Sequence, residues 1–481
     1  MRIEDYALIG DCHSAALIGR DGSVDWLCWP RFDSPACFAA LLGSPEHGRW
    51  RIAPSQEPLS CRRAYREDTL VLETEYETAT GKVAVVDFMP IRAAQCDLVR
   101  IVMGRGGRVP MEMELILRFD YGSAVPWVTR LPEGHGIRAI AGPDLAALRT
   151  TVPVHGEDLK TVARFEVKEG DVVPFELAHQ ASHLGEPAAI DPMRALEKTD
   201  SFWKAWSGRC SMRGEWSGAV RRSLITLKAL TYAPTGGIVA APTTSLPERP
   251  GGKRNWDYRF CWLRDATLTL LALMNAGYYE EAGSWRDWLV RAVAGSPAQM
   301  QILYGLGGER RIGEWEADWL PGYEGSRPVR IGNAAVGIAA YFVNFVITSI
   351  GLSGKVTGYV TGLGLSPIST MVVIVLFYLV LGMFMESLSM LVATVPIITP
   401  AVMALGFDPV WFGVMMMLLL ETALITPPVG FNLFVVQAVR TRGRIYDVIV
   451  GSLPFVATLM VMIALLIAFP QIALWLPKKL S

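Results

Sequence analysis

Charged residues are distributed very unevenly along this chain. Its 481 residues include 45 Lys or Arg and 46 Asp or Glu, yet only ten charged residues occur from Val336 onward. The part before Val336 has a charge density of roughly a quarter, as in soluble globular proteins. The part after it has the composition of membrane-embedded helices. We therefore predict two unrelated parts, a soluble front and a polytopic membrane segment, joined between Ala335 and Val336.

The composition of the front indicates a cytoplasmic protein. All seven cysteines lie there, their number is odd and no C-x-x-C pair occurs, so we expect buried reduced thiols rather than disulfides or a zinc site. The opening MRIEDYALIG has no long apolar run, which argues against a signal peptide. A net charge of -1 gives no reason to expect nucleic acid as a partner.

The first two hundred residues read as β-structure. Short apolar or alternating runs occur between turn signals, at residues 69–74, 82–88, 98–103 and 111–119. The glycine-rich segment 104–107 is one of the expected separators, and 132–134 is another. Many short strands at this spacing are typical of a β-sandwich, which we place at residues 1–202.

From about Asp200 the apolar period becomes helical. The segments that carry it are residues 202–206, 219–232, 266–276 and 284–294. The connections between them are rich in Gly, Pro, Arg and Trp. We therefore predict a helical bundle or barrel portion over residues 203–335.

The segment RNWDYRFCWLRDATL, residues 254–268, is the first candidate binding site. A sugar site needs flat aromatic faces for the ring and planar charged groups for paired hydroxyls. Trp262, Arg264 and Asp265 could supply both. The alternative is a helix N-terminus with a surface ion pair and a core tryptophan, and the residues alone leave both readings open.

The second candidate is EWEADWLPGYEGSRPVRIGN, residues 314–333. It again mixes Trp, Tyr, carboxylates and arginines in a long Gly- and Pro-rich loop, and such loops often bind ligands. The alternative is a structured connection between helices.

Both segments, together with the opening IEDYALIGDCHSAALIGRDGSVDWLCWPRFDSPACFAALLG, resemble glycoside hydrolase family 15, which holds glucoamylase-like and trehalase-like enzymes. The resemblance covers residues 1–335. It implies a trehalase-like N-terminal β-sandwich, the first part of an (α/α)6 barrel, an α-glucoside substrate and no cofactor. It also implies that Trp262, Arg264 and Asp265 hold the sugar, with Trp315, Arg327 and Arg330 near the same pocket.

The catalytic machinery of that family is where this chain departs from it. Family members are inverting hydrolases with one glutamate as general acid and another as general base. In the family the acid follows a G-I-W-E-like motif downstream of the G-N-A stretch, and the base lies near the end of the barrel. This chain leaves the pattern after Ala335, so no residue is assigned as catalytic. We do not promote Glu314, Glu316 or Asp318 to those roles, and we expect an incomplete, truncated barrel.

Long apolar runs make up the back, residues 336–481. They span residues 336–350, 371–385, 409–420 and 454–469, and we expect three to five membrane-embedded helices. Prolines flanked by Thr, Ser, Asn or Glu interrupt them at 394–400 and 426–432. A single proline could be a simple kink, but repeated interruptions at membrane depth are typical of transporter binding sites.

The stretches GMFMESLSMLVATVPIITPAVMALGFDPVWFGV and ETALITPPVGFNLFVV resemble the C-terminal part of the large membrane subunit of TRAP transporters, sodium-coupled importers of organic acids such as C4-dicarboxylates and sialic acid. The resemblance implies an inner-membrane location and sodium as a coupling ion. It also implies a small membrane subunit and a periplasmic binding protein as partners. The residues at or near the transport site would be Glu386, Ser387, Ser389, Thr426, Gly430 and Asn432. Arg440, Arg442 and Arg444 indicate a cytoplasmic loop, whereas Lys478 and Lys479 leave the orientation of the terminus open.

Three hypotheses follow for function. The chain could act on an α-glucoside, it could be a TRAP-type permease, or it could be a fusion in which neither part works. We favour the fusion, because the resemblance of the front to its family and that of the back to its own are both interrupted at the same junction. No Pro-, Ser- or Gly-rich linker lies between the two parts. The expected result is a chimeric chain that lacks both catalytic glutamates and the first transport repeat.

Overall fold

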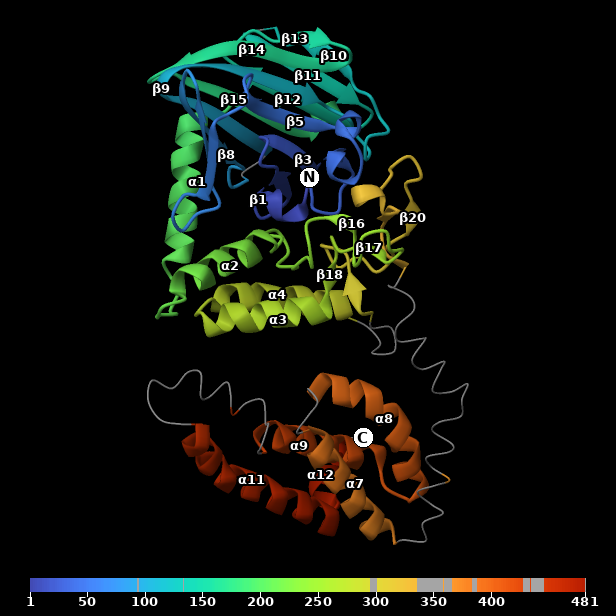
Figure 1. Cartoon of the computed structure of the whole chain (residues 1–481). Helices are drawn as coiled ribbons and strands as arrows, with labels where there is room; N and C mark the ends of the chain where they lie inside the picture. Colours follow the sequence, from blue (N-terminus) through green and yellow to red (C-terminus); the bar gives the residue numbers. More distant parts are fainter. Residues whose placement is uncertain are drawn as a thin grey trace. The chain divides into compact units, whose positions relative to one another are not determined.

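The computed structural model describes residues 1–92, 95–132, 134–294, 301–334, 358, 366–382, 387–426, 433 and 445–480 (Figure 1). The chain divides into two compact units, Met1–Ala339 and Ala340–Ser481. The first unit is rich in β-sheet and continues into helices, as the sequence predicts. Each unit is described by itself.

Two antiparallel sheets form the front half of the first unit. One sheet runs β1-β2-β3-β5-β9-β14-β13, with β4 beside β3, and the other runs β6-β7-β8-β9-β15-β12-β11-β10. The strands are β1 (Ala7–Gly10), β2 (Ala15–Ile18), β3 (Ser23–Cys28), β4 (Ala36–Phe38), β5 (Arg49–Pro54), β6 (Ser60–Tyr65), β7 (Leu72–Thr78), β8 (Gly81–Phe88), β9 (Cys96–Ile116), β10 (Trp127–Arg130), β11 (His135–Ala141), β12 (Asp144–Thr150), β13 (His155–Glu157), β14 (Lys160–Lys168) and β15 (Val172–Ala181). The largest apolar cluster takes residues from both sheets, including Ile9 and Ile52 of one and Leu72 and Leu177 of the other. The sheets therefore face each other across a shared core.

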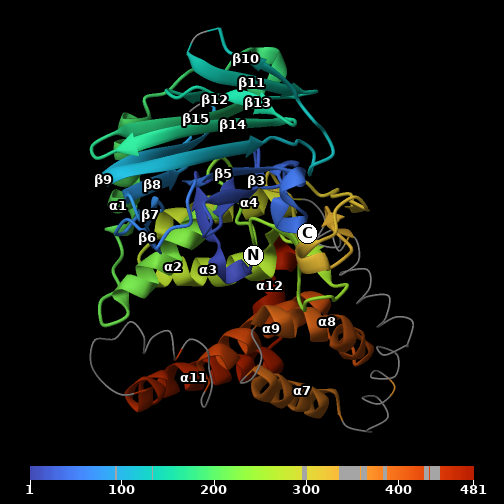
Figure 2. The same ribbon diagram turned by 45° about the horizontal axis from the view of Figure 1, so that its top comes forward.

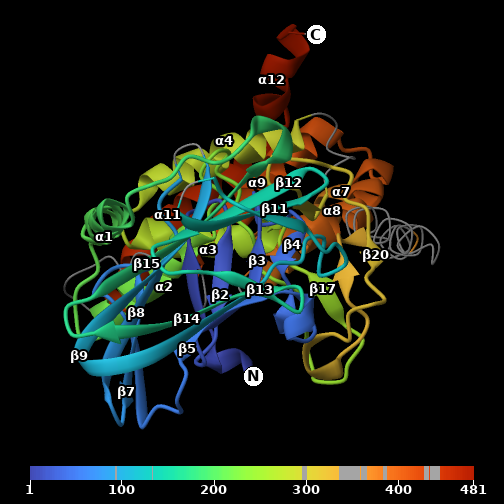
Figure 3. The same ribbon diagram turned by 90° about the horizontal axis from the view of Figure 1, so that it is seen from above.

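Strand β9 corrects one expectation from the sequence. The glycine-rich segment 104–107 was predicted to separate two strands, but β9 runs unbroken through it and belongs to both sheets (Figure 3). Its first half pairs with β8 and β15, and its second half pairs with β5 and β14. Glycine is needed here for close approach, since a Cβ on Gly104 would lie 1.8 Å from the Lys168 carbonyl oxygen. These glycines permit the strand to change sheets rather than to turn.

Within the described residues of this unit, four α-helices follow the sheets. They are α1 (Pro192–Ser207), α2 (Ser217–Ala229), α3 (Leu263–Asn275) and α4 (Tyr279–Val293). Helix α1 begins eight residues before the predicted change of period, because Asp191 caps it by accepting from the backbone N–H groups of Met193 and Arg194. Pro192 then occupies its first turn, where no N–H is needed. Leu196 of α1 packs on Val71 and on residues of β8 and β9, and α2 and α3 lie side by side (Figure 2).

Short strand pairs connect the helices. They are β16 (Thr244–Pro247) with β17 (Asn255–Asp257), β18 (Cys261–Trp262) with β19 (Leu303–Tyr304), and β20 (Trp315–Glu316) with β21 (Arg330–Ile331). The first candidate segment therefore forms β17, β18 and the start of α3, and the second forms the strand pair β20–β21. All seven cysteines of the unit are free, and six of them are buried.

The second unit is helical throughout its described part. Its helices are α7 (Pro367–Gly382), α8 (Ser387–Ala404), α9 (Pro409–Ile425), α11 (Ile445–Ala468) and α12 (Gln471–Leu480). Among the described residues, one segment, Tyr446–Ala468, is long and apolar enough to cross a bilayer. Pro367–Leu381 and Pro409–Ile425 are apolar but shorter. A polytopic segment with three to five embedded helices therefore stays a prediction.

The predicted interruptions of these helices have different outcomes. Helix α8 runs continuously through Pro396 and Pro400, so the interruption expected at 394–400 is wrong. Helix α9 ends at Ile425, directly before the second predicted interruption. The residues from 427 to 432 lie outside the described part of the chain.

Candidate functional site

Trp262, Arg264 and Asp265 lie together at the start of α3. Trp262 ends β18 and precedes the helix, and Asp265 lies in its first turn. Arg264 Nη2 is 3.1 Å from Asp265 Oδ2, and the Arg264 guanidinium lies 5.7 Å from the centre of the Trp262 ring. Arg264 is 71% exposed, whereas the Trp262 indole nitrogen is buried and has no hydrogen-bond partner among the described residues. An aromatic face and a guanidinium–carboxylate pair are thus adjacent, and the surface ion pair of the alternative reading is also present.

Arg330 organises the second group. It follows Pro328 and Val329 into β21, where it pairs with Glu316 of β20. Its Nε lies 3.7 Å from a Glu314 oxygen and 3.6 Å from a Glu316 oxygen, and its guanidinium lies 4.9 Å from the centre of the Trp256 ring. The side chain is held further because Nη1 donates to the Lys253 carbonyl oxygen at 2.9 Å. Arg330 is therefore a fixed cation flanked by an aromatic face and two carboxylates.

A pocket of about 340 Å³ lies beside Arg330. Arg327 and Arg330 both line it, together with Lys253, Glu316, Ala317, Asp318, Leu320, Pro328 and Val329. Trp315 is not among the lining residues. Its ring packs instead 5.8 Å from that of Trp319 and 5.9 Å from that of Tyr121. The structure thus brings Arg327 and Arg330 together around one cavity and directs Trp315 to a separate aromatic group.

The two groups are separate in their direct contacts. Within the described part of the chain, no hydrogen bond, ion pair or ring contact joins Trp262, Arg264 or Asp265 to Trp315, Arg327 or Arg330. The expectation that the six residues share one pocket therefore stays a prediction.

A buried ion pair that sequence reasoning did not single out supports both groups. Asp257 and Arg259 are fully buried, and Arg259 Nη2 lies 2.7 Å from Asp257 Oδ2. Arg259 also donates to the Tyr121 hydroxyl at 2.9 Å and to the Ser34 carbonyl oxygen at 2.9 Å. Burial lowers the pKa of an arginine, but Asp257 overcomes this and raises the pKa of Arg259 well above its ordinary value. The only sequence signal was the D-x-R spacing inside an aromatic-rich loop.

The same aspartate holds the end of the second segment. Gly332 donates its backbone N–H to Asp257 Oδ2 at 3.0 Å, and Asn333 Nδ2 donates to the Asp257 carbonyl oxygen at 3.1 Å. Ser245 Oγ accepts from the Arg330 N–H at 2.7 Å and donates to the Arg330 carbonyl oxygen at 2.8 Å. The backbone that carries Arg330 is therefore fixed on both sides.

Three carboxylates of the two groups make ion-pair contacts, whereas Asp318, which also lines the pocket, has no ion pair among the described residues. Glu314 and Glu316 contact one guanidinium, and Glu314 also accepts from the Ala334 N–H at 2.9 Å. Asp265 contacts Arg264. Among the described residues, no three His, Cys, Asp or Glu side chains are grouped to hold a metal ion. The arrangement can bind hydroxyl groups.

Few of the predicted transport residues can be placed. Thr426 lies just after α9, and its hydroxyl donates to the Thr422 carbonyl oxygen at 2.5 Å. Ser387 and Ser389 lie in the first turn of α8, with side chains that are not described. Glu386, Gly430 and Asn432 lie outside the described residues.

Comparisons with known families match three segments in order. The trehalase-like N-terminal family matches residues 1–203, and glycosyl hydrolases family 15 matches residues 215–338. The DctM component of the tripartite ATP-independent periplasmic transporter matches residues 334–472. The last two matches meet within residues 334–338, close to the predicted join.

The curated proteins that match this chain also form two groups, trehalases and TRAP transporter permeases. A trehalase of Mycolicibacterium smegmatis is 36% identical over 373 residues, which cover 69% of this chain and 54% of that protein. A trehalase of Mycobacterium tuberculosis is 34% identical, covering 69% and 53%. The C4-dicarboxylate TRAP transporter large permease protein DctM of Vibrio cholerae is 35% identical over 141 residues, covering 29% of this chain and 31% of the permease.

A solved structure of a bacterial glucoamylase complexed with acarbose matches with a TM-score of 0.44 at 12% identity, covering 64% of this chain and 52% of the other. The chain spans about half the length of the curated trehalases that it matches. The front of the chain resembles glycoside hydrolase family 15 with a trehalase-like N-terminal region, and the back resembles the DctM component of TRAP transporters.

Proposed function

We propose that this is a chimeric chain whose front binds α-glucosides, with trehalose as the first candidate, and does not hydrolyse them. The relatives that match the front are named as trehalases. The match to glycosyl hydrolases family 15 supports the same substrate class, because the matched residues include Trp262, Arg264, Arg327 and Arg330.

One observation carries the proposal that hydrolysis is absent. Inverting hydrolysis needs a carboxyl group that gives a proton and a second carboxylate that activates water on the opposite face of the sugar. Glu314 and Glu316 instead share the guanidinium of Arg330. Both therefore serve to hold Arg330, and neither is free for either catalytic role. A further carboxylate, Asp318, lines the same pocket, and the proposal assigns it a binding role.

Binding and turnover are measured separately on the full chain in lipid nanodiscs. Calorimetric titration with trehalose and maltose is expected to show weak binding, and a glucose-release assay on the same samples is expected to show no product. Clear glucose release would overturn the absence of hydrolysis, whereas a lack of heat with both sugars would overturn the binding proposal.

Two arginine variants and a matched control locate the binding. We expect Arg330→Gln to weaken trehalose affinity about tenfold or more, because a charged hydrogen-bond donor is lost. Arg264→Gln tests the other group in the same way. Arg311→Gln is the control, since Arg311 is exposed and does not line the pocket. An unchanged affinity in both the Arg330 and the Arg264 variant would show that sugar binds elsewhere.

We also propose that the back places the chain in the inner membrane, with the front in the cytoplasm. The DctM match and the apolar segment Tyr446–Ala468 support this. Exposed apolar side chains on this helix, such as Phe455 and Val461, would lie against lipid. Alkaline washing of membrane fractions tests the location, and release of the chain into the supernatant would overturn it.

The alternative function is that of a membrane component of a sodium-coupled TRAP importer of organic acids. The match over residues 334–472 favours it, and such a role would require sodium, a small membrane subunit and a periplasmic binding protein. Alternating access normally uses two structural repeats, so we expect no transport by this chain alone. Sodium-dependent uptake of labelled succinate into proteoliposomes that contain only this chain would support the alternative.

A further inference from the structure

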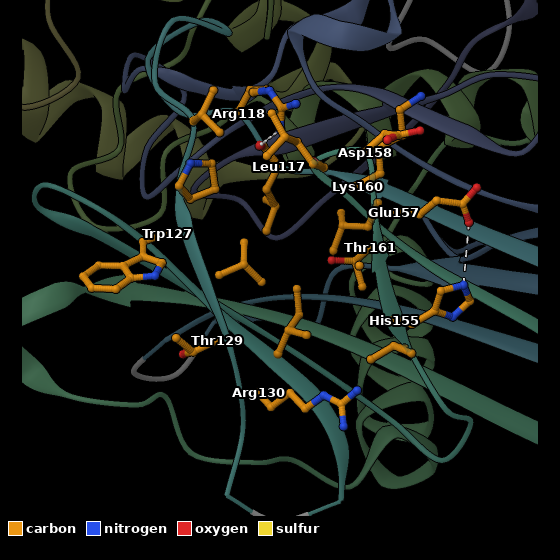
Figure 4. Close-up of a pocket in the computed structure, with 18 residues that line it drawn as sticks. Leu117, Arg118, Trp127, Thr129, Arg130, His155, Glu157, Asp158, Lys160 and Thr161 are labelled. Atoms are coloured by element: carbon orange, nitrogen blue, oxygen red, sulfur yellow. Dashed lines mark hydrogen bonds and ion pairs between the residues drawn. The ribbon is translucent and has the colours of Figure 1, made fainter.

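A second pocket, of about 450 Å³, lies in the sheet region of the first unit (Figure 4). Strands β10 and β11 of one sheet form one wall, and β13 and β14 of the other sheet form the opposite wall. The last residues of β9 and those after it close the inner end. The pocket thus opens between two sheet edges that do not pair with each other, and its volume is in the range of small-molecule sites.

The floor of this pocket is apolar. Leu115, Leu117 and Ile137 line it and are almost fully buried, and Val128 and Val154 add further apolar surface. Trp127, on the strand that forms one wall, also lines the pocket and is largely exposed. The floor therefore suits an apolar body.

Arg118 gives this pocket its charge. The residue lines the cavity and is 6% exposed, and its Nη1 donates to the carbonyl oxygens of Leu117 at 2.8 Å and Leu159 at 3.3 Å. No carboxylate of the described residues lies within ion-pair distance of it. Burial lowers the pKa of Arg118, which is the expected cost of a desolvated cation. A buried guanidinium without an acid partner is unfavourable unless an anion reaches it.

The other charges around the pocket are mostly paired. Lys160 is neutralised by Glu46 at 3.3 Å and Glu114 at 3.5 Å. Glu157 lies 3.6 Å from His155, as the dashed line in Figure 4 shows, and 3.4 Å from Arg164. Arg130 reaches across the opposite end of the pocket (Figure 4) and is exposed, while Asp158 lies on the turn between β13 and β14. The buried cation at the inner end is thus Arg118.

We propose that this pocket binds a small organic acid with an apolar body, whose carboxylate meets Arg118 and whose body lies on Leu115, Leu117 and Ile137. A carboxylate fits because a guanidinium presents paired donors to its two oxygens. The site is independent of the pocket beside Arg330 and of any sugar bound there.

Calorimetric titration of the full chain in nanodiscs tests this, with empty nanodiscs as the blank. The probe is 4-phenylbutyrate, and the matched compounds are 4-phenyl-1-butanol and 4-phenylbutylamine, which keep the body and replace the carboxylate. We expect the acid to bind about tenfold or more tightly than either. Equal affinity for the alcohol, or no binding of the acid, overturns the proposal.

Variants assign the binding to the pocket. Arg118→Gln is expected to weaken affinity for the acid about tenfold or more, and Arg118→Lys is expected to restore part of it. Because Arg118 is buried and its loss could unfold the sheets, Arg130→Gln is a second variant at an exposed pocket position, with a smaller loss expected. Arg62→Gln, an exposed position on β6, is the control. If both Arg118 variants fold and bind the acid with unchanged affinity, the assignment to this pocket is overturned. Trehalose binding by Arg130→Gln should equal that of the unmodified chain.

Discussion

Asp257 and Arg259 form an ion pair that is fully excluded from solvent, with Arg259 Nη2 2.7 Å from Asp257 Oδ2. Arg259 reaches Ser34 and Tyr121 in the sheet region, and Asp257 holds Gly332 and Asn333 after β21. One pair of side chains two positions apart thus joins three segments that are distant in sequence. It links the sheet region to both candidate binding segments.

Removing one member of this pair should destabilise the first unit strongly. Arg259→Met leaves the buried Asp257 carboxylate without its counter-charge, and we expect the free energy of unfolding to fall by about 3–5 kcal/mol. Urea unfolding of the full chain in nanodiscs, followed by tryptophan fluorescence, measures this. The control is Arg286→Gln, whose pair with Asp287 is exposed and should contribute little.

The double variant Asp257→Asn with Arg259→Met distinguishes the contribution of the ion pair to the free energy of unfolding from that of side-chain packing. Because neither remaining side chain carries a buried charge, we expect the double variant to lose less stability than the sum of the two single variants. Strictly additive losses would show that the two residues act independently.

Glu281 should be a second point of fragility, since it joins three helices. It lies on α4, accepts from the Trp206 indole of α1 at 2.6 Å, and contacts Lys228 of α2 at 3.0 Å. Burial acts to raise its pKa, but the Trp206 hydrogen bond and Lys228 outweigh burial and lower the pKa below its ordinary value. The stability that it contributes is therefore present at neutral pH and is lost as the pH falls through the lowered pKa.

We expect Glu281→Ala to cost about 3–5 kcal/mol at pH 7, because Lys228 and the indole lose a buried partner. Far-ultraviolet circular dichroism in a thermal scan measures the loss. Glu280→Ala is the matched control, as the neighbouring side chain is exposed. An equal effect of both substitutions would contradict the assigned role.

Elements with a regular apolar period could be predicted from the sequence, because burial of one face imposes that period. The strand at 82–88 and the helices at 219–232, 266–276 and 284–294 fall on β8, α2, α3 and α4. The prediction failed at 104–107 and 394–400, where Gly and Pro lie inside continuous elements. In β9 the glycines allow close approach to Lys168, and in α8 the prolines lie within a continuous helix.

The candidate site was less predictable than the fold. Local sequence brings Trp262, Arg264 and Asp265 together, because they lie next to one another at a helix start. The contact of Arg330 with Trp256 depends instead on tertiary packing between β21 and β17. Two partners of Arg259, Ser34 and Tyr121, lie more than a hundred residues upstream, so no local pattern could reveal them.

Glu176 should make the stability of the first unit depend on pH near neutrality. Burial raises the pKa of this carboxyl from its ordinary 4.5 to about 7. The folded chain therefore holds the proton more tightly than the unfolded chain, and stability falls as the pH rises from about 4.5 to about 7. Urea unfolding at a series of pH values should show a smaller fall in Glu176→Gln than in the unmodified chain. Glu169→Gln, at an exposed turn position, is the control and should show the same fall of stability with pH as the unmodified chain. An unchanged fall in Glu176→Gln would exclude Glu176 as the cause.

Gly332 should tolerate no side chain, because its backbone is in the left-handed region and closely packed. Its φ is +81°, and a Cβ there would lie 1.6 Å from the Gly313 carbonyl oxygen. The same residue donates its N–H to Asp257, so any shift of the backbone also disturbs the buried ion pair. Gly142 is the matched control, since it has a φ of +58° and no atom within 4 Å of the added Cβ. Gly142→Ala should cost only the conformational penalty, about 1–2 kcal/mol, and Gly332→Ala should cost clearly more and weaken trehalose binding by displacing Arg330. Equal losses of unfolding free energy in the two variants would show that the loop at Gly313 moves aside without cost.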